Sequence, residues 1–231
     1  RSGNTTYGAN GNVTGYLGDL MKMFFNEIPD QQKVYIDNPI AFTIYDTGGV
    51  DTINLSTVNA VQTINLNGGG ISNVGGLKGN MQIARGTVIE KAIGGNNVDT
   101  IYGNSAANSL AGRGGSDRLL GAAGNDLLNG GIGNDTMDGG IGADTAVFTA
   151  TQNVTVRLGI TTAQATGQGT DTLTNIENVF SGDGHDRIYG NDLGNSLIAG
   201  AGNDSLYGSA GSDTLRNDAG NDVLSVATDV D

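Results

Sequence analysis

Aspartate recurs in this chain at a fixed spacing, and carboxylates repeated in that way can assemble cation sites. Counted in nines from Gly94 and again from Ser181, the sixth position is Asp in nine of eleven units and Asn in the other two. These positions are Asp99, Asn108, Asp117, Asp126, Asp135, Asp144, Asp186, Asn195, Asp204, Asp213 and Asp222. Short carboxylates beside Gly-rich turns offer the hard oxygen ligands that calcium prefers.

The eighth position of every unit is apolar, which predicts a stacked all-β coil. Each unit reads as a Gly-rich turn of six residues and a strand of about three, because Gly and Asn tolerate positive φ in turns. One inward apolar residue per strand cannot make a core, but stacked coils align such residues into a ladder. If two units form one coil, Asp99 stacks on Asp117 and Asp117 on Asp135. The same rule stacks Asp126 on Asp144, and Asp186, Asp204 and Asp222 on one another.

Stacked carboxylates repel each other, and a calcium ion between them would turn that repulsion into a crosslink. Calcium takes six to eight oxygens, so turn carbonyls must supply the others. Besides the aspartates, the predicted ligands in the turns are Gly94, Asn96, Gly112, Gly114, Gly121, Ala123, Gly124, Gly130, Ile132, Gly133, Gly139, Gly142, Gly202, Gly211 and Gly220. Without metal, charge repulsion and glycine entropy favour an unfolded segment. The alternative is that these are plain β-turns that bind no metal.

The composition of the chain limits the classes of partner that it can bind. The chain has 231 residues, a net charge of -13 and no Cys. This charge argues against nucleic acid and anionic membranes and in favour of cations. No apolar run is long enough to span a bilayer, and no disulfide framework can form. No signal peptide is visible at Arg1, and we expect the sequence to be a fragment of a longer protein.

Segments upstream of the repeats resemble the C-terminal region of the serralysin metalloproteases, and the nonapeptides resemble RTX calcium-binding repeats. The resemblance extends from Arg1 to about Phe148. It rests on the runs at 1–8, 42–53, 64–67, 74–80 and 89–95. It implies a secreted parallel β-roll that binds several calcium ions. In that family the roll leaves the cell through a type I secretion apparatus, folds outside in calcium, and serves an N-terminal protease domain as an intramolecular chaperone.

The resemblance also implies two calcium sites before the repeats. One ion would be held by Arg1, Gly3, Thr5, Asp46, Gly48 and Asp51. A second would be shared by Gly49, Asp51, the carbonyl of Val88 and the carboxylate of Glu90.

The segment between the two repeat blocks is similar to the segment before the first. Residues 154–158 parallel 62–66, residues 169–173 parallel 49–53, and residues 176–179 parallel 89–92. By this parallel, Asp171 and Glu177 are predicted to hold a further calcium. We therefore expect a pre-roll β-sandwich-like segment at 1–93, a first roll at 94–148, a connector at 149–180 and a second roll at 181–231.

Catalytic residues are missing from the chain. A serralysin zinc site is built around H-E-x-x-H, and this chain has one His, His185, in a Gly-rich turn. We expect His185 to be an exposed turn residue and the chain to hold neither zinc nor an active site. The apolar stretch at 17–25 is interpreted as a short packed helix or a partner-binding face. Other functions left open are a structural or adhesive module of a larger exported protein, or the roll of an exported lipase or epimerase.

Overall fold

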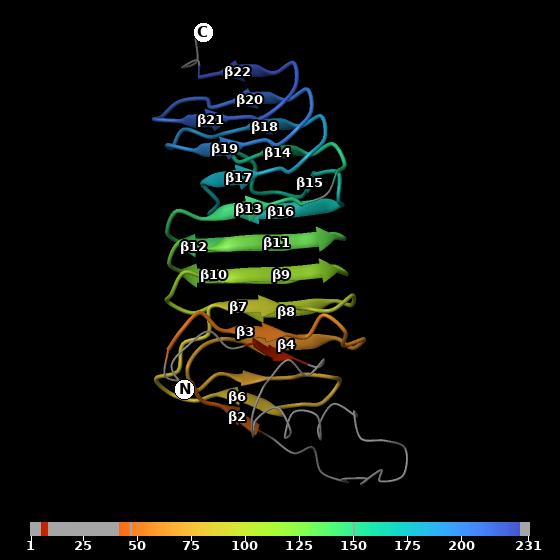
Figure 1. Cartoon of the computed structure of the whole chain (residues 1–231), viewed down its shortest axis with the longest axis vertical. Helices are drawn as coiled ribbons and strands as arrows, with labels where there is room; N and C mark the ends of the chain where they lie inside the picture. Colours follow the sequence, from red (N-terminus) through yellow and green to blue (C-terminus); the bar gives the residue numbers. More distant parts are fainter. Residues whose placement is uncertain (1–5, 9–41, 47, 150, 227–231) are drawn as a thin grey trace.

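The computed structural model describes residues 6–8, 42–46, 48–149 and 151–226, and these residues contain strands and turns but no helix. Successive strands alternate between two facing layers, so the chain rises as a solenoid from the N-terminal to the C-terminal end (Figure 1). The predicted all-β parallel roll is confirmed. The apolar stretch at 17–25 and the ligands predicted at Arg1, Gly3 and Thr5 lie outside the described residues.

One layer is a single parallel sheet of nine strands that passes through both repeat blocks. Its strands, in spatial order, are β1 (Thr6–Gly8), β3 (Thr52–Asn54), β7 (Lys91–Ile93), β9 (Ser109–Gly114), β11 (Leu127–Ile132), β13 (Thr145–Val147), β17 (Asn178–Phe180), β19 (Ser196–Ile198) and β21 (Thr214–Arg216).

The facing layer is divided into two sheets, one for each block. The six-stranded sheet contains β15 (Gln164–Ala165), β16 (Thr170–Thr174), β12 (Thr136–Ile141), β10 (Arg118–Ala123), β8 (Asp99–Tyr102) and β4 (Gln62–Asn65). The four-stranded sheet contains β14 (Thr155–Arg157), β18 (Arg187–Tyr189), β20 (Ser205–Tyr207) and β22 (Val223–Ser225). A separate three-stranded sheet joins β2 (Phe42–Ile44), β6 (Met81–Ile83) and β5 (Ile71–Ser72) at the N-terminal end.

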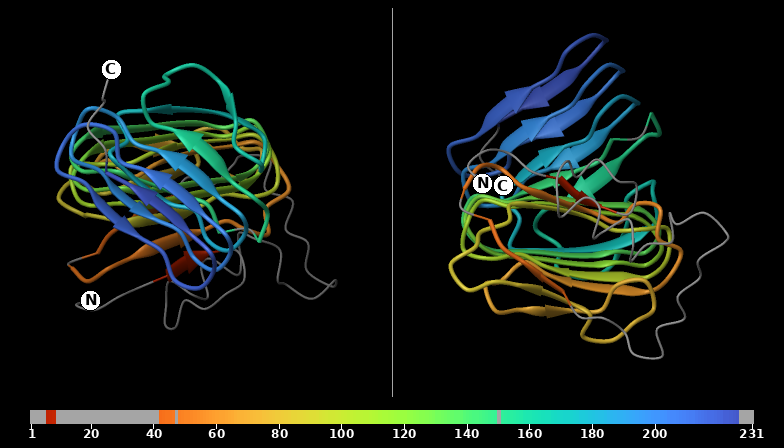
Figure 2. Two further views of the ribbon diagram at one scale, coloured as in Figure 1. Left: turned by 90° about the horizontal axis from the view of Figure 1, so that it is seen from above. Right: turned by 60° about the horizontal axis from the view of Figure 1, so that its bottom comes forward.

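The coils change direction where the facing layer is divided (Figure 2). In Figure 2 the coils of the second block, in blue, are turned relative to the yellow and green coils of the first. The nine-stranded sheet nevertheless pairs β13 with β17 across the connector without interruption. The domain boundaries expected at 93/94, 148/149 and 180/181 stay predictions.

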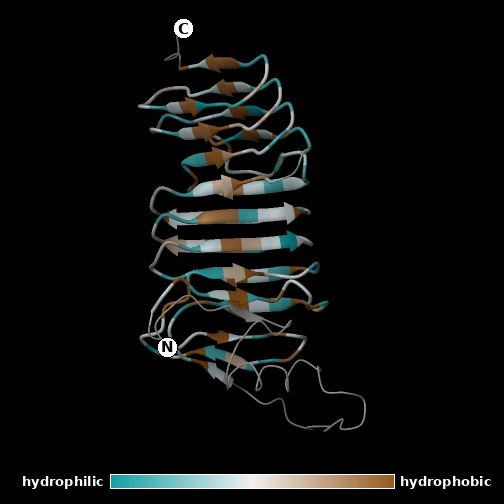
Figure 3. Ribbon diagram, in the orientation of Figure 1, coloured by the Kyte–Doolittle hydropathy of each residue, from teal (hydrophilic) through white to brown (hydrophobic). Residues whose placement is uncertain are grey.

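The centre of the core is a ladder of inward-facing apolar residues, made of the eighth positions of the repeats and of matching residues in the strands before and between them. In the six-stranded sheet, Ile64, Ile101, Leu119, Met137 and Leu173 are direct cross-strand partners. Figure 3 shows brown, hydrophobic segments in the middle of many strands. All five are at most 2% exposed, and each fully buried side chain of this size contributes roughly 1.5–3 kcal/mol.

Two details of the ladder differ from the expected unit. Strands β9 to β12 are six residues long rather than three, because backbone pairing continues through the glycines, as between Gly131 and Arg113. At the C-terminal end Leu224 is 45% exposed, since no further coil of the described chain covers it.

Candidate cation-binding turns

Three columns of acidic or amide side chains follow the edges of the solenoid, at the N-terminal ends of the strands. The first column belongs to the six-stranded sheet, the second to the nine-stranded sheet and the third to the four-stranded sheet. The first column is Asp99, Asp117, Asp135 and Asp171; the second is Glu90, Asn108, Asp126, Asp144, Glu177, Asn195 and Asp213; the third is Asp186, Asp204 and Asp222.

Each column is tied together by hydrogen bonds that run from one turn to the next. In the first column, Asp117 Oδ1 accepts the backbone N–H of Asp99 at 2.7 Å, and Asp135 Oδ1 accepts that of Asp117 at 2.8 Å. The second and third columns repeat this bond, as from Asp126 N to Asp144 Oδ1 and from Asp186 N to Asp204 Oδ1, both at 2.8 Å. The predicted stacking of like turns, two units per coil, is therefore confirmed.

The second carboxylate oxygen has no donor in the middle of the columns. The Oδ2 atoms of five of the described aspartates are fully buried and without a hydrogen-bond partner. These aspartates are Asp117, Asp126, Asp135, Asp144 and Asp204. A buried acceptor left unpaired costs about 1–3 kcal/mol, and a buried charge costs more. These five turns therefore need a positive group that the described residues do not supply.

Burial favours the protonated, neutral form of several of these carboxylates. Desolvation raises the pKa of Asp117 to about 7, against backbone hydrogen bonding that lowers it, and the neighbouring Asp135 and Asp99 raise it further. Desolvation likewise raises the pKa of Asp126 and of Asp135 to about 6. A divalent cation beside these groups would favour their charged form and remove this penalty.

Glycine opens most of the turns, and there the carboxylate or amide side chain of the same unit packs against it. A Cβ atom on Gly112 would lie 2.2 Å from Asp117 Oδ2, and one on Gly121 would lie 2.2 Å from Asp126 Oδ2. Later in the turn Gly133 has a φ of 144°, and a Cβ there would lie 1.5 Å from the carbonyl oxygen of Gly115 in the neighbouring coil. Backbone carbonyls and carboxylates are thus brought close together, as oxygen ligands of one ion must be.

The residues present fit a hard cation held mainly by backbone oxygens. Within the described ranges, no three His, Cys, Asp or Glu side chains converge on a point that could hold a metal. An ion in these turns would therefore draw on one or two carboxylates and on turn carbonyls. The site residues predicted from the sequence in both blocks stay predictions at the level of individual ligands.

At the ends of the columns the protein itself supplies a donor. Asp99 Oδ2 accepts the N–H of Gly95 at 2.7 Å. Asp171 Oδ2 accepts the hydroxyl of Thr166, and Asp186 Oδ2 accepts that of Ser181. Sequence reasoning missed both hydroxyls, although a signal was present. Each lies five residues before its aspartate, at the spacing where most nonapeptide units have Gly.

The structure connects Glu177 with Asp144 and places Asp171 in a different column, and the calcium site expected at Asp171 and Glu177 stays a prediction. Glu177 Oε2 accepts the N–H of Asp144 at 2.8 Å, just as Glu90 Oε2 accepts that of Asp51 at 2.8 Å. Asp171 lies in the first column, at the opposite end of β16 from Glu177.

Some of the ligands expected before the repeats contact one another in the part of the chain that the structure describes. Asp46 and Asp51 are both buried, and Asp46 Oδ1 accepts the N–H of Gly48 at 3.2 Å. Glu90 reaches Asp51 through the bond described above. Val88, expected to offer its carbonyl, has a side chain that is 48% exposed.

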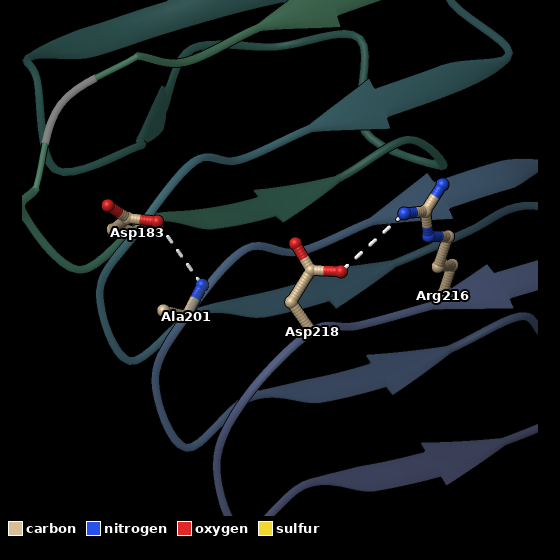
Figure 4. A network of polar contacts seen from close by, with 4 residues as sticks. All are labelled: Asp183, Ala201, Arg216 and Asp218. Carbon is tan, nitrogen blue, oxygen red and sulfur yellow. Dashed lines mark hydrogen bonds and ion pairs between the residues drawn. The ribbon is translucent and has the colours of Figure 1, made fainter.

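His185 lies in an exposed turn of the third column, where its Nδ1 accepts the N–H of Asn203 at 2.8 Å. Nearby, Asp183 Oδ1 accepts the N–H of Ala201 at 3.2 Å, which adds a further bond between turns (Figure 4). The ion pair of Arg216 and Asp218 in the same view is 3.6 Å long and exposed, so it contributes little.

Two family models together match most of the chain. The family described as Peptidase M10 serralysin C terminal matches residues 1–173, and the RTX calcium-binding nonapeptide repeat matches residues 175–192 and 189–224. No helix of the described residues is long and apolar enough to cross a membrane.

Several curated relatives are similar to part of the chain. Serralysin of Photorhabdus laumondii subsp. laumondii is 44% identical over 100 residues, which are 43% of this chain and 20% of that protein. Serralysin B of Dickeya chrysanthemi is 43% identical over 98 residues, 41% of this chain and 20% of its own length. Metallopeptidase AprA of Pseudomonas marginalis is 41% identical over 103 residues, 45% of this chain and 19% of that protein. The matched region is thus about a fifth of each relative's length.

Proposed function

Since the chain belongs to the serralysin C-terminal family and carries RTX calcium-binding repeats, we propose that it is the calcium-folded module of an exported zinc metalloendopeptidase. The observation that carries this proposal is the set of five buried Oδ2 atoms without a donor in the stacked turns. Zinc and the catalytic residues would belong to a protease domain outside this chain, whose single His cannot supply H-E-x-x-H.

The mechanism follows from electrostatics. At neutral pH in the absence of calcium, folding must bury carboxylates such as Asp117 and Asp135 beside each other, which their raised pKa values oppose. The net charge of -13 adds general repulsion to the compact state. In a calcium-poor cytosol the chain would stay loose enough for export, and extracellular calcium would neutralise the columns and drive folding.

Folding outside the cell would let the module assist both export and the folding of the protease domain. A chain that folds only in calcium can pass a type I secretion apparatus unfolded. Folding outside the cell then prevents the chain from moving back. The completed roll would present a rigid solenoid on which an N-terminal protease domain completes its own folding. On this view the chain is secreted and its partners are calcium, the secretion apparatus and that domain.

The test uses the complete reading frame that contains this chain. The encoded protein is refolded in calcium or in chelator, and casein cleavage is measured with and without 1,10-phenanthroline. We expect an H-E-x-x-H helix upstream of the roll and phenanthroline-sensitive cleavage only after refolding in calcium. A protein whose upstream region holds further repeats, a nucleophile elbow or a long β-helix, and which does not cleave casein, would contradict the protease assignment. Those results would favour an adhesive module, a lipase or an epimerase respectively.

A further inference from the structure

Two turns of the second column contain Asn where the others contain Asp or Glu, and their side chains form a closed amide cluster. In the first block, Asn108 Nδ2 lies 3.4 Å from the carbonyl oxygen of Ile89 and 3.3 Å from that of Glu90. Asn104 Nδ2 donates to the carbonyl of Ile89 at 2.8 Å and to that of Leu66 at 3.2 Å. The backbone N–H of Asn104 donates in turn to Asn108 Oδ1 at 2.7 Å.

The second block repeats the cluster with different residues. Asn195 Nδ2 donates to the carbonyl of Glu177 at 2.8 Å and to Asn191 Oδ1 at 3.1 Å. Asn195 Oδ1 accepts the N–H of Asn191 at 2.8 Å. In both blocks the cluster lies directly after a Glu that reaches back to the preceding turn, so the same arrangement occurs twice in one chain.

The amide clusters provide the positive group that the Asp turns lack. In the Asp turns the second side-chain atom is an oxygen, and in the five turns described above it has no donor. In the Asn turns the equivalent oxygen beside the turn glycine is Oδ1, and it accepts the backbone N–H of Asn104 or Asn191. The amide nitrogen faces the preceding coil, and its hydrogens point at carbonyl oxygens. A cation would need those oxygens as ligands and would meet the positive ends of the N–H dipoles instead.

We propose that the two Asn turns are cation-free joints, in which side-chain amides make the crosslink that calcium makes between Asp turns. This inference rests on the proposed calcium-binding function and specifies which turns take the ion. Each block then contains, near its start, one joint that needs no metal, while the turns that follow it become rigid only when calcium is bound.

The first test converts a joint into a cation site. In Asn108→Asp a carboxylate oxygen replaces the amide nitrogen and faces the carbonyls of Ile89 and Glu90 and Asn104 Oδ1. Bound calcium is counted by equilibrium dialysis, and unfolding is followed by circular dichroism. We expect one additional ion per chain and a calcium midpoint for folding shifted to higher concentration. The control Asn54→Asp adds the same charge where the side chain only accepts the N–H of Ser56, and it should change neither quantity.

The second test covers the case in which Asn108→Asp fails to fold. Asn104→Ala removes the donor to Leu66 and Ile89 and should weaken the roll, while the number of bound calcium ions stays that of the wild type. Loss of one ion in Asn104→Ala, or an unchanged ion count in folded Asn108→Asp, would overturn the inference and leave the proposed function intact. A wild-type chain that binds no calcium would instead overturn the proposed function.

Discussion

Replacing Asp117 with Asn should have opposite effects on stability with and without calcium. Asp117 is 2% exposed, one of its carboxylate oxygens has no donor, and its neighbours in the column are Asp99 and Asp135. The change removes the charge and keeps the shape. The amide is compatible with this turn position, because Asn108 and Asn195 occupy the equivalent place in the second column.

The magnitude follows from the pKa of the buried carboxyl. Burial raises the pKa of Asp117 from 3.8 to about 7, and one pH unit corresponds to about 1.4 kcal/mol. Because the folded state holds this proton more tightly than the unfolded state, the favourable contribution is complete below about pH 4. It is lost as pH rises towards 7. Above pH 7 in chelator the ionisable side chain therefore destabilises the fold by roughly 4 kcal/mol, and the variant Asp117→Asn escapes this cost.

Circular dichroism in chelator between pH 4 and pH 8 measures the effect. The wild type should lose β signal as pH rises, and Asp117→Asn should keep it to a higher pH. In saturating calcium the same variant should bind one ion fewer and unfold at a lower temperature than the wild type. Asp218→Asn is the control, because that side chain is 62% exposed and should change neither transition. A variant that is destabilised in chelator, or stabilised equally in both conditions, would refute the reasoning.

Three further substitutions test the packing of the coils. Gly133→Ala should prevent the roll from folding even in saturating calcium, because its Cβ would lie 1.5 Å from a backbone oxygen. The control is Gly75→Ala, where φ is 65° and the space is open; it should lower stability in thermal unfolding by only about 1–2 kcal/mol. Leu128→Ala removes a fully buried rung of the ladder and should lower the free energy of unfolding by about 2–5 kcal/mol in a urea titration, with the ion count unchanged. Thr166→Val leaves Asp171 without its hydroxyl donor and should cost about 1–3 kcal/mol, while Thr166→Ser should behave as wild type; equal stability of the two would show that the hydroxyl is dispensable.

The columns and the core ladder could be predicted from the sequence because a period of nine fixes both. Once two units form one coil, the register places Asp117 beside Asp135 and Leu119 beside Met137. Periodicity also identifies the turn glycines, although only the structure shows that Gly112 is required because the carboxylate of its own unit packs against it.

The connector could not be predicted as well, because it interrupts the period. Internal similarity aligned Asp171 with Asp51, but Glu177 contacts the backbone of Asp144. The side chain of Glu177 accepts the N–H of Asp144, which belongs to the last turn of the first block. An alignment of the connector with the segment before the repeats does not include that turn. The hydroxyl donors Thr166 and Ser181 were missed for a related reason. They stand where most units have Gly, and only the structure shows that they donate to the buried Oδ2 atoms of Asp171 and Asp186.

Calcium titration of the chelated wild-type chain at pH 7.5, with circular dichroism and bound metal recorded together, tests the central claim most directly. The buried and unpaired carboxylate oxygens predict a cooperative gain of β signal, several calcium ions bound per chain and no equivalent effect of magnesium. A chain that is already fully folded in chelator at this pH and binds no calcium would contradict the claim that cations hold these turns together.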